Sequence, residues 1–244
     1  MANRISVTSG KGGVGKTTIS AGLAAVFSSS GKRTLLIDCD AGLPGLDIML
    51  GCSDKVNFTW YDVYCERCEP SDAIIQINEF LHLIPAPKYA PDEDCNDAVK
   101  NTVDALSDNY DIIIADAPAG LGRGLIRAIK ATDNALIVAT ADEISVKGAS
   151  AVDSVLRDNG ITQTRLLINK YSVKGAVKGK LLTVDEIIDK TAVQLIGIIP
   201  EDINLQYKTV YKKSLKTVKS TKAFTRISKR INGESVSLSL SQLK

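Results

Sequence analysis

Residues 4–18 constrain the fold more than any other part of the chain. They read Arg-Ile-Ser-Val-Thr-Ser-Gly-Lys-Gly-Gly-Val-Gly-Lys-Thr-Thr, and the alternating apolar residues Ile5 and Val7 lead straight into the glycine-rich turn. An apolar pattern of helical period follows over residues 19–27. Residues 10–17 fit G-x-x-x-x-G-K-[ST], a pattern that occurs where a strand turns into a helix. The sequence therefore predicts a strand, a phosphate-binding loop and a helix, in that order.

The residue types in this loop suit a polyphosphate. The glycines lack a Cβ atom, so the backbone can curl and aim its N–H groups inward. Together with the positive end of the following helix, these amides form a cradle for anions. In such a loop Lys16 reaches the β- and γ-phosphates, and the Thr17 hydroxyl binds magnesium. The predicted nucleotide-binding residues here are Gly12, Gly13, Val14, Gly15, Lys16, Thr17 and Thr18.

Two further apolar runs end in aspartate. Residues 34–38 end in Asp38, with Asp40 two positions on, and residues 110–116 end in Asp116. Short continuous apolar runs are typical of parallel strands buried on both faces, and ligands collect at the carboxyl ends of such strands. Beside a triphosphate, one carboxylate can hold magnesium or its waters while another orients the attacking water. Asp38 and Asp116 are therefore the candidate metal residues.

The rest of the chain alternates strand and helix patterns. Apolar runs at residues 80–84, 134–140, 165–169 and 195–200 predict further buried strands. We expect an α/β fold of the P-loop NTPase class, a doubly wound, mostly parallel sheet with helices on both faces. Residues 1–234 are predicted to form a single ATPase domain. In its last helix Phe224, Ile227 and Ile231 share one face, and residues 235–244 form a short tail.

Composition and charge indicate the cellular compartment of the protein and the surfaces that it could bind. The chain has 244 residues and five scattered cysteines, an odd number that favours a reducing compartment, so we expect a cytoplasmic protein. Residues 1–122 carry nine basic and seventeen acidic side chains, a net charge of −8. Residues 203–244 carry ten basic and one acidic, a net charge of +9. This basic C-terminal region fits DNA or an anionic membrane surface, and equally a solvated helix face.

Several other features give weak signals. The pair Cys65 and Cys68 has the spacing of a metal knuckle, but no second pair accompanies it, so a surface coincidence is the favoured interpretation. His82, the single histidine, is expected to be a satisfied core residue. Arg123 and Arg127 could supply an arginine finger, but a pair of surface residues is the safer interpretation. Residues 52–72 look irregular, and residues 87–97 form an acidic loop.

The second lysine of the loop carries a family resemblance. The sequence Gly-Lys11-Gly-Gly-Val-Gly-Lys-Thr-Thr resembles the deviant Walker A loop of the MinD/ParA family of ATPases. In that family the extra lysine reaches across a dimer interface to the partner's nucleotide. The resemblance therefore implies ATP and Mg²⁺ as ligands, ATP-dependent homodimerisation, and a catalytic role for Lys11 together with Lys16.

Two other segments resemble the switches of this family. By resemblance, the segment from Asp38 to Asp47 is switch I, in which Asp40 positions the attacking water and Asp38 acts through magnesium-bound water. Residues 116–120 resemble switch II, in which Gly120 offers an amide to the γ-phosphate. The family also places Asn169 at the adenine base. The same resemblance makes Pro200 and Asp202, in the turn after the last strand, candidate adenine contacts.

The chain departs from the MinD branch of the family at two places. Pro44-Gly45 stands where that branch usually has Arg-Asn, and Gly148 replaces an aspartate at the dimer and partner surface. These departures bear on partner contacts rather than on hydrolysis. The C-terminal tail is also too short, and too poor in basic residues, for the membrane helix of that branch.

The resemblance implies a Mg-ATP-hydrolysing switch that positions the cell division site, with an activating or regulatory protein as partner. DNA partition of the ParA kind is the second expectation, favoured by the basic C-terminal region, and flagellar placement is the third. An iron–sulfur or other metabolic ATPase is a more distant alternative. Salt-dependent binding to DNA, compared with binding to liposomes, separates the first two. In the first case the protein would work at the inner face of the cell membrane.

Overall fold

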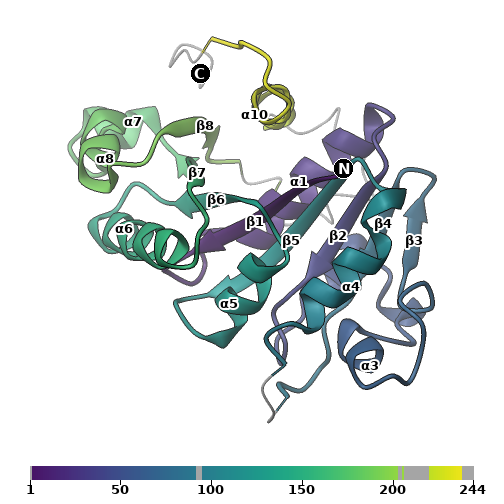
Figure 1. The fold of residues 1–244 in the computed structure, drawn as a ribbon. Coiled ribbons are helices and arrows are strands. Elements are labelled where there is room, and N and C mark those ends of the chain that lie inside the picture. The colour runs from purple at the N-terminus through teal and green to yellow at the C-terminus, as the bar shows by residue number, and fades with distance from the viewer. Residues whose placement is uncertain (1, 92–94, 203–204, 206–219, 238–244) are drawn as a thin grey trace.

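The computed structural model describes residues 2–91, 95–202, 205 and 220–237. The chain folds into one eight-stranded sheet with helices on both faces (Figure 1). The strands are β1 (Asn3–Ser9), β2 (Thr34–Asp38), β3 (Ile75–Asn78), β4 (Leu81–Ile84), β5 (Ile112–Ala119), β6 (Asn134–Ala139), β7 (Gln163–Tyr171) and β8 (Leu195–Pro200). Their order in the sheet is β3-β4-β2-β5-β1-β6-β7-β8. Only β3 pairs antiparallel, so the predicted doubly wound, mostly parallel sheet is confirmed.

The helices connect these strands. They are α1 (Lys16–Ser29), α2 (Leu46–Leu50), α3 (Trp60–Tyr64), α4 (Ala98–Leu106), α5 (Arg123–Lys130), α6 (Glu143–Asp158), α7 (Val173–Val177), α8 (Val184–Thr191) and α10 (Thr221–Ile231). Two short 3₁₀ helices lie at Ser53–Lys55 and Ser107–Asn109. No helix in the described residues is long and apolar enough to cross a lipid bilayer.

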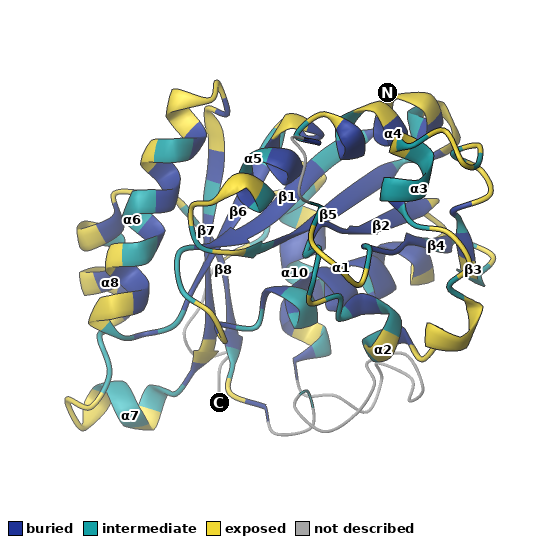
Figure 2. Cartoon of the chain, turned by 90° about the horizontal axis from the view of Figure 1, so that it is seen from below, coloured by how far each residue is buried: buried dark blue, intermediate teal, exposed yellow. Residues whose placement is uncertain are grey.

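Each face of the sheet has its own apolar core. Helices α1 and α10 cover one face, and α4, α5 and α6 cover the other (Figure 1). The final helix packs as its sequence predicts, because Phe224 and Ile227 are fully buried and the helix ends before Gly233 at a positive φ. The Phe224 ring lies so close to Gly22 of α1 that a Cβ atom there would approach it to 2.5 Å. The strands are buried along most of their length, while exposed residues gather on the outer faces of α6 and α8 (Figure 2).

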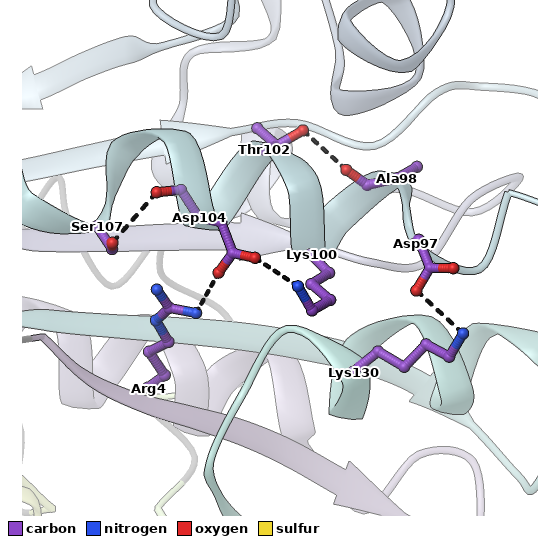
Figure 3. A network of polar contacts seen from close by, with 8 residues as sticks. All are labelled: Arg4, Asp97, Ala98, Lys100, Thr102, Asp104, Ser107 and Lys130. Carbon is purple, nitrogen blue, oxygen red and sulfur yellow. Dashed lines mark hydrogen bonds and ion pairs between the residues drawn. The ribbon is translucent and has the colours of Figure 1, made fainter.

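Surface charges fix α4 against its neighbours. Asp104 of α4 accepts hydrogen bonds from Arg4, at the start of β1, and from Lys100, one turn earlier in the helix (Figure 3). Lys130 of α5 donates to Asp97, the residue directly before α4. These side chains are partly exposed, so each pair contributes at most about 1 kcal/mol. The network orients α4 more than it stabilises it.

Three expectations need correction. Arg127 is not a surface residue, since only 6% of it is exposed. Residues 52–72 are less irregular than expected, because α3 begins there with a capping box from Thr59 and Asp62. His82 is half-buried rather than in the core, although its Nδ1 does find a partner in the Tyr110 hydroxyl at 2.7 Å. The lysine-rich stretch from 207 to 219 and the end of the tail, 238–244, lie outside the described residues.

Candidate nucleotide site

The glycine-rich loop follows β1 and leads into α1, as the sequence predicts. Gly13 and Gly15 adopt φ values of +75° and +96°, a region that side chains with a Cβ atom rarely enter. A Cβ atom on Gly15 would also lie 2.5 Å from the side-chain nitrogen of Asn169. The backbone therefore needs glycine at position 15 on two independent grounds. Val14, between these glycines, is buried and anchors the loop in the core below α1.

Lys16 points into the molecule at the base of the loop. Only 8% of the residue is exposed, and its Nζ donates to the Ser9 hydroxyl at 3.0 Å. That hydroxyl in turn donates to the carbonyl oxygen of Lys11 at 2.8 Å. Burial lowers the pKa of Lys16, while the carboxylates of Asp116 and Asp40 oppose this shift. A bound polyphosphate would place further negative charge beside this buried ammonium and so stabilise its charged form.

Asp38 and Asp116 lie opposite each other on neighbouring strands. Both are almost fully buried, and burial raises their pKa values to about 6 for Asp38 and about 7 for Asp116. The Asp38 carboxylate raises the pKa of Asp116 further, whereas hydrogen bonds from Thr17 and Ser20 lower it. The Ser20 hydroxyl donates to Asp116 at 2.8 Å.

This donor set fits a magnesium ion. A hydroxyl and carboxylates are the oxygen ligands that Mg²⁺ prefers, and two buried carboxylates gain from a nearby divalent cation. Thr17 and Asp116 lie close together and are the residues that would hold it. Asp38 has another task as well, because its carboxylate accepts backbone N–H groups of Asp40, Gly45 and Leu46 at 2.9 to 3.1 Å. For Asp38, the prediction that it acts on magnesium through a magnesium-bound water therefore stands.

Asp40 lies just beyond this pair. It is half-buried, and burial raises the pKa of its carboxyl while the Lys16 ammonium lowers it. Gly120, at φ +93°, donates its amide to the Ser9 carbonyl at 3.0 Å. The ends of β2, β5 and β1 therefore bring the two predicted switch segments to the phosphate loop. The roles of Asp40 in positioning water and of Gly120 at the γ-phosphate remain predictions.

Lys11 makes its contact outside the loop, at the start of α6. Its Nζ forms an ion pair with Asp142 at 3.0 Å, and 39% of the lysine side chain is exposed. Asp142 caps α6 by accepting from the amide of Ser145, and it also accepts from the Thr140 hydroxyl at 2.6 Å. Lys11 is thus held at the rim of the site by a contact within its own chain.

The end of β7 supports the loop from behind. The Asn169 side chain donates to the Val14 carbonyl at 2.7 Å, and Lys170 donates to the Gly13 carbonyl at 2.8 Å. Lys170 has a positive φ of 54°, which is uncommon for a residue with a side chain. The sequence analysis missed Lys170, because nothing local marks a lysine that bonds a backbone 157 positions away. The adenine contact of Asn169 stays a prediction.

The turn after β8 brings Pro200 and Asp202 toward the same edge of the sheet. Pro200 pairs in register with Tyr171, at the end of β7. The Asp202 carboxylate accepts from the backbone amide and the hydroxyl of Ser220, at 3.1 and 3.2 Å. Asp202 therefore anchors the start of α10. Its contact with adenine, like that of Pro200, stays a prediction.

The phosphate loop also touches α6 through two glycines. A Cβ atom on Gly10 would lie 2.3 Å from the carbonyl oxygen of Gly148, so the two backbones are in direct contact. A side chain at position 148 would approach Gly10 to 3.2 Å. This contact explains why position 148 is a glycine, independently of any partner protein.

Replacing Gly10 by alanine tests this contact. The new methyl group has no room, so the loop or α6 must move, and we expect Gly10→Ala to lower the free energy of unfolding by about 1–3 kcal/mol. Gly12→Ala is the control, since the nearest atom to its Cβ would lie 4.0 Å away. Urea unfolding without nucleotide measures both. Equal stability of the two variants would contradict the contact.

Metal sites other than this one find no support. Cys65 and Cys68 are half-buried free thiols, and the described residues contain no group of three or more His, Cys, Asp or Glu side chains able to hold a metal ion.

Comparison with known proteins places this site in a family. A family model described as an AAA domain matches residues 2–169. Septum site-determining protein MinD of Thermotoga maritima is 36% identical over 98% of this chain and 91% of its own length. The MinD protein of Bacillus subtilis is 32% identical over 98% of this chain and 92% of its own.

Solved structures agree. The Aquifex aeolicus MinC:MinD cell division protein complex contains a chain that matches with a TM-score of 0.89 and 31% identity, over 98% of both chains. MinD of Pyrococcus horikoshii, solved with Mg-ADP, matches with a TM-score of 0.82 and 26% identity over 95% of this chain and 96% of that one. The family suggested by the sequence is confirmed: the chain belongs to the MinD family of septum site-determining proteins.

Proposed function

We propose that this chain is an ATP-dependent dimerising switch that hydrolyses Mg-ATP and helps to place the cell division site. Its substrate is ATP, held by the backbone amides of residues 12–18 and by Lys16. Asp40 orients the attacking water, and the Gly120 amide, which donates to the Ser9 carbonyl in this structure, would turn to the γ-phosphate. Bound magnesium would neutralise the charge that develops on the phosphates. The names of the relatives, which include a complex with MinC, support this function and a regulatory partner protein.

One observation carries the proposal: the two lysines of the loop differ in burial and in their contacts. Lys16 is buried within the site, whereas Lys11 lies at the exposed rim. A phosphate loop that served only its own chain would need one lysine. A second one that faces outward is suited to a nucleotide held by another copy of the protein.

The surface around Lys11 supports contact with a second copy. Three exposed apolar side chains follow the carboxyl ends of neighbouring strands: Leu43 after β2 is 80% exposed, Leu121 after β5 is 47% exposed and Ile144 after β6 is 71% exposed. These strands flank or neighbour β1, so the three residues lie on the edge of the sheet that carries the loop. Large exposed apolar side chains at one edge mark an association surface.

Lys11→Ala tests this function. We expect the variant to bind Mg-ATP nearly as well as the wild type, because the cradle and Lys16 remain, but to stay monomeric with ATP. Lys32→Ala, an exposed lysine after α1 at the opposite edge of the sheet, is the control and should dimerise normally. Light scattering after gel filtration measures the mass, and fluorescent ATP measures binding. A dimer formed by Lys11→Ala would overturn the role given to this lysine.

A further inference from the structure

The single tryptophan of the chain holds the backbone of the predicted metal-site aspartate. Trp60, the first residue of α3, has no exposed surface. Its indole N–H donates to the backbone carbonyl of Asp38 at 2.9 Å. The next peptide unit is also fixed, because the amide of Cys39 donates to the Asp116 carbonyl at 2.9 Å. The backbone from Asp38 to Asp40 is thus held from two sides.

The neighbouring strand explains why an indole makes this contact. β4 pairs with β2 only as far as Ile84 opposite Ile37. The next residue of that chain is Pro85, which has no N–H group and cannot continue the ladder. A buried carbonyl without a donor is costly, and the Trp60 indole supplies the missing hydrogen bond. Trp60 is tied to this point as well, since its own amide donates to the Pro85 carbonyl at 3.3 Å.

A buried arginine holds the tryptophan in turn. The Arg127 guanidinium carbon lies 4.7 Å from the centre of the Trp60 ring, a cation–π contact. The same guanidinium donates to the carbonyl oxygen of Cys95 at 3.3 Å and to its sulfur at 3.1 Å. Its contacts are therefore a ring, a carbonyl and a thiol. A buried charge is costly to desolvate, so a buried arginine at this place is expected to serve the function of the protein.

Arg127 also lies close to the backbone that Trp60 holds. Its guanidinium contacts the same indole whose N–H group holds the Asp38 carbonyl. Arg127 belongs to α5, the helix that begins directly after the loop at Gly120. That loop contacts the end of β1, directly before the phosphate loop, through the hydrogen bond from Gly120 to Ser9. A continuous set of contacts thus leads from the Gly120 loop through Arg127 and Trp60 to Asp38.

From these contacts we infer that Arg127 and Trp60 are positioning residues that set the place of the Asp38–Asp40 backbone according to the position of α5. The inference deepens the proposed function and rests on it. When the Gly120 loop shifts at a bound nucleotide, α5 moves Arg127, and the stacked indole carries the Asp38 carbonyl with it. Trp60 touches neither the nucleotide nor the water, and acts through Asp38 and Asp40.

The first experiment removes the hydrogen bond and keeps the ring. Trp60→Phe should lower kcat by about tenfold, the worth of one buried hydrogen bond in a rate. KM for ATP should change by less than about threefold, since the phosphate loop still binds the substrate uniformly. The rate is expressed per bound nucleotide, so that a fraction of unfolded protein does not count. Wild-type kcat in this variant would overturn the inference.

The second experiment uses Trp60 as its own reporter. In the wild-type protein, Mg-ATP should change the fluorescence of this one tryptophan, because the indole moves with the switch. Arg127→Met should abolish the change and lower kcat, and Arg127→Lys, which keeps a cation, should recover part of both. Lys130→Met is the control on the same helix, since its partly exposed side chain pairs with Asp97 at the surface. It should respond like the wild type.

The outcomes separate the two proposals. A fluorescence response in Arg127→Met equal to that of the wild type overturns the inference and leaves the proposed function intact. A wild-type protein that binds no fluorescent ATP overturns the proposed function and, with it, the inference. Tryptophan movement that is lost in Arg127→Met, regained in part in Arg127→Lys and kept in Lys130→Met supports both.

Discussion

Lys16→Ala is expected to abolish nucleotide binding. The wild-type ammonium is buried at the base of the loop, and burial lowers its pKa. Among the described residues its one hydrogen-bond partner is the Ser9 hydroxyl. Phosphate oxygens would replace that single contact by charge-assisted hydrogen bonds in a site of low dielectric. Two such bonds correspond to an affinity at least about 100-fold weaker in the variant.

The measurement is the titration of each protein with fluorescent ATP in the presence of magnesium. Lys11→Ala serves as the matched comparison, because it removes a lysine from the same loop but from its exposed rim. We expect Lys11→Ala to bind and Lys16→Ala not to bind. Affinity of Lys16→Ala within threefold of the wild type would mean that the buried lysine does not meet the phosphates.

Asp40→Ala is expected to separate binding from hydrolysis. Asp40 is near the Lys16 ammonium, which lowers the pKa of a carboxyl that burial raises. Removing it takes away the group that orients the attacking water while leaving the amide cradle and Lys16 in place. Loss of such a group typically costs about 10²–10⁴ in rate, so ATP should stay bound and unhydrolysed.

Release of phosphate and the retention of ATP after gel filtration measure this effect. Asp54→Ala, a change at an exposed aspartate shortly after α2, should hydrolyse ATP like the wild type. If Asp40→Ala turned over at the wild-type rate, another group would have to position the water. Asp38 and Asp116 are poor substitutes, because one holds the loop at Gly45 and the other accepts from Ser20.

Much of the site could be predicted because its signals are local. The phosphate loop, its strand and α1 occupy adjacent residues, and α1 (Lys16–Ser29) contains the apolar helical pattern of residues 19–27. Asp38 and Asp116 each end an apolar run, and parallel pairing then brings such ends together. The periodicity of apolar residues and the positions of the glycines were sufficient to predict this part of the site.

The remaining features depend on contacts between distant residues. Arg127 was expected to form a surface pair with Arg123, but the fold places it over Trp60 and beside Cys95. The local pattern likewise does not show that Pro85 leaves a carbonyl of β2 for the indole of Trp60, 22 positions from Asp38. The contact of Lys170 with the loop and the hydrogen bond from Ser220 to Asp202 belong to the same class. Such contacts follow from the order of the strands, which residue patterns alone do not specify.

The two lysines of the loop are the residues through which the nucleotide site and the proposed dimer are linked. Lys16 is buried in the site of its own chain, whereas Lys11 lies at a rim that carries exposed apolar residues. In the state described here Lys11 pairs with Asp142 at the start of α6. Exposed ion pairs of this kind are worth at most about 1 kcal/mol, so this contact opposes a move toward a partner's nucleotide only weakly.

The mass of Asp40→Ala protein in solution, measured by light scattering with Mg-ATP and again with Mg-ADP, tests the proposed switch most directly. We predict twice the monomer mass with Mg-ATP, because the trapped triphosphate holds two copies together through Lys11, and the monomer mass with Mg-ADP. Protein that binds ATP but keeps the monomer mass with both nucleotides would contradict the switch.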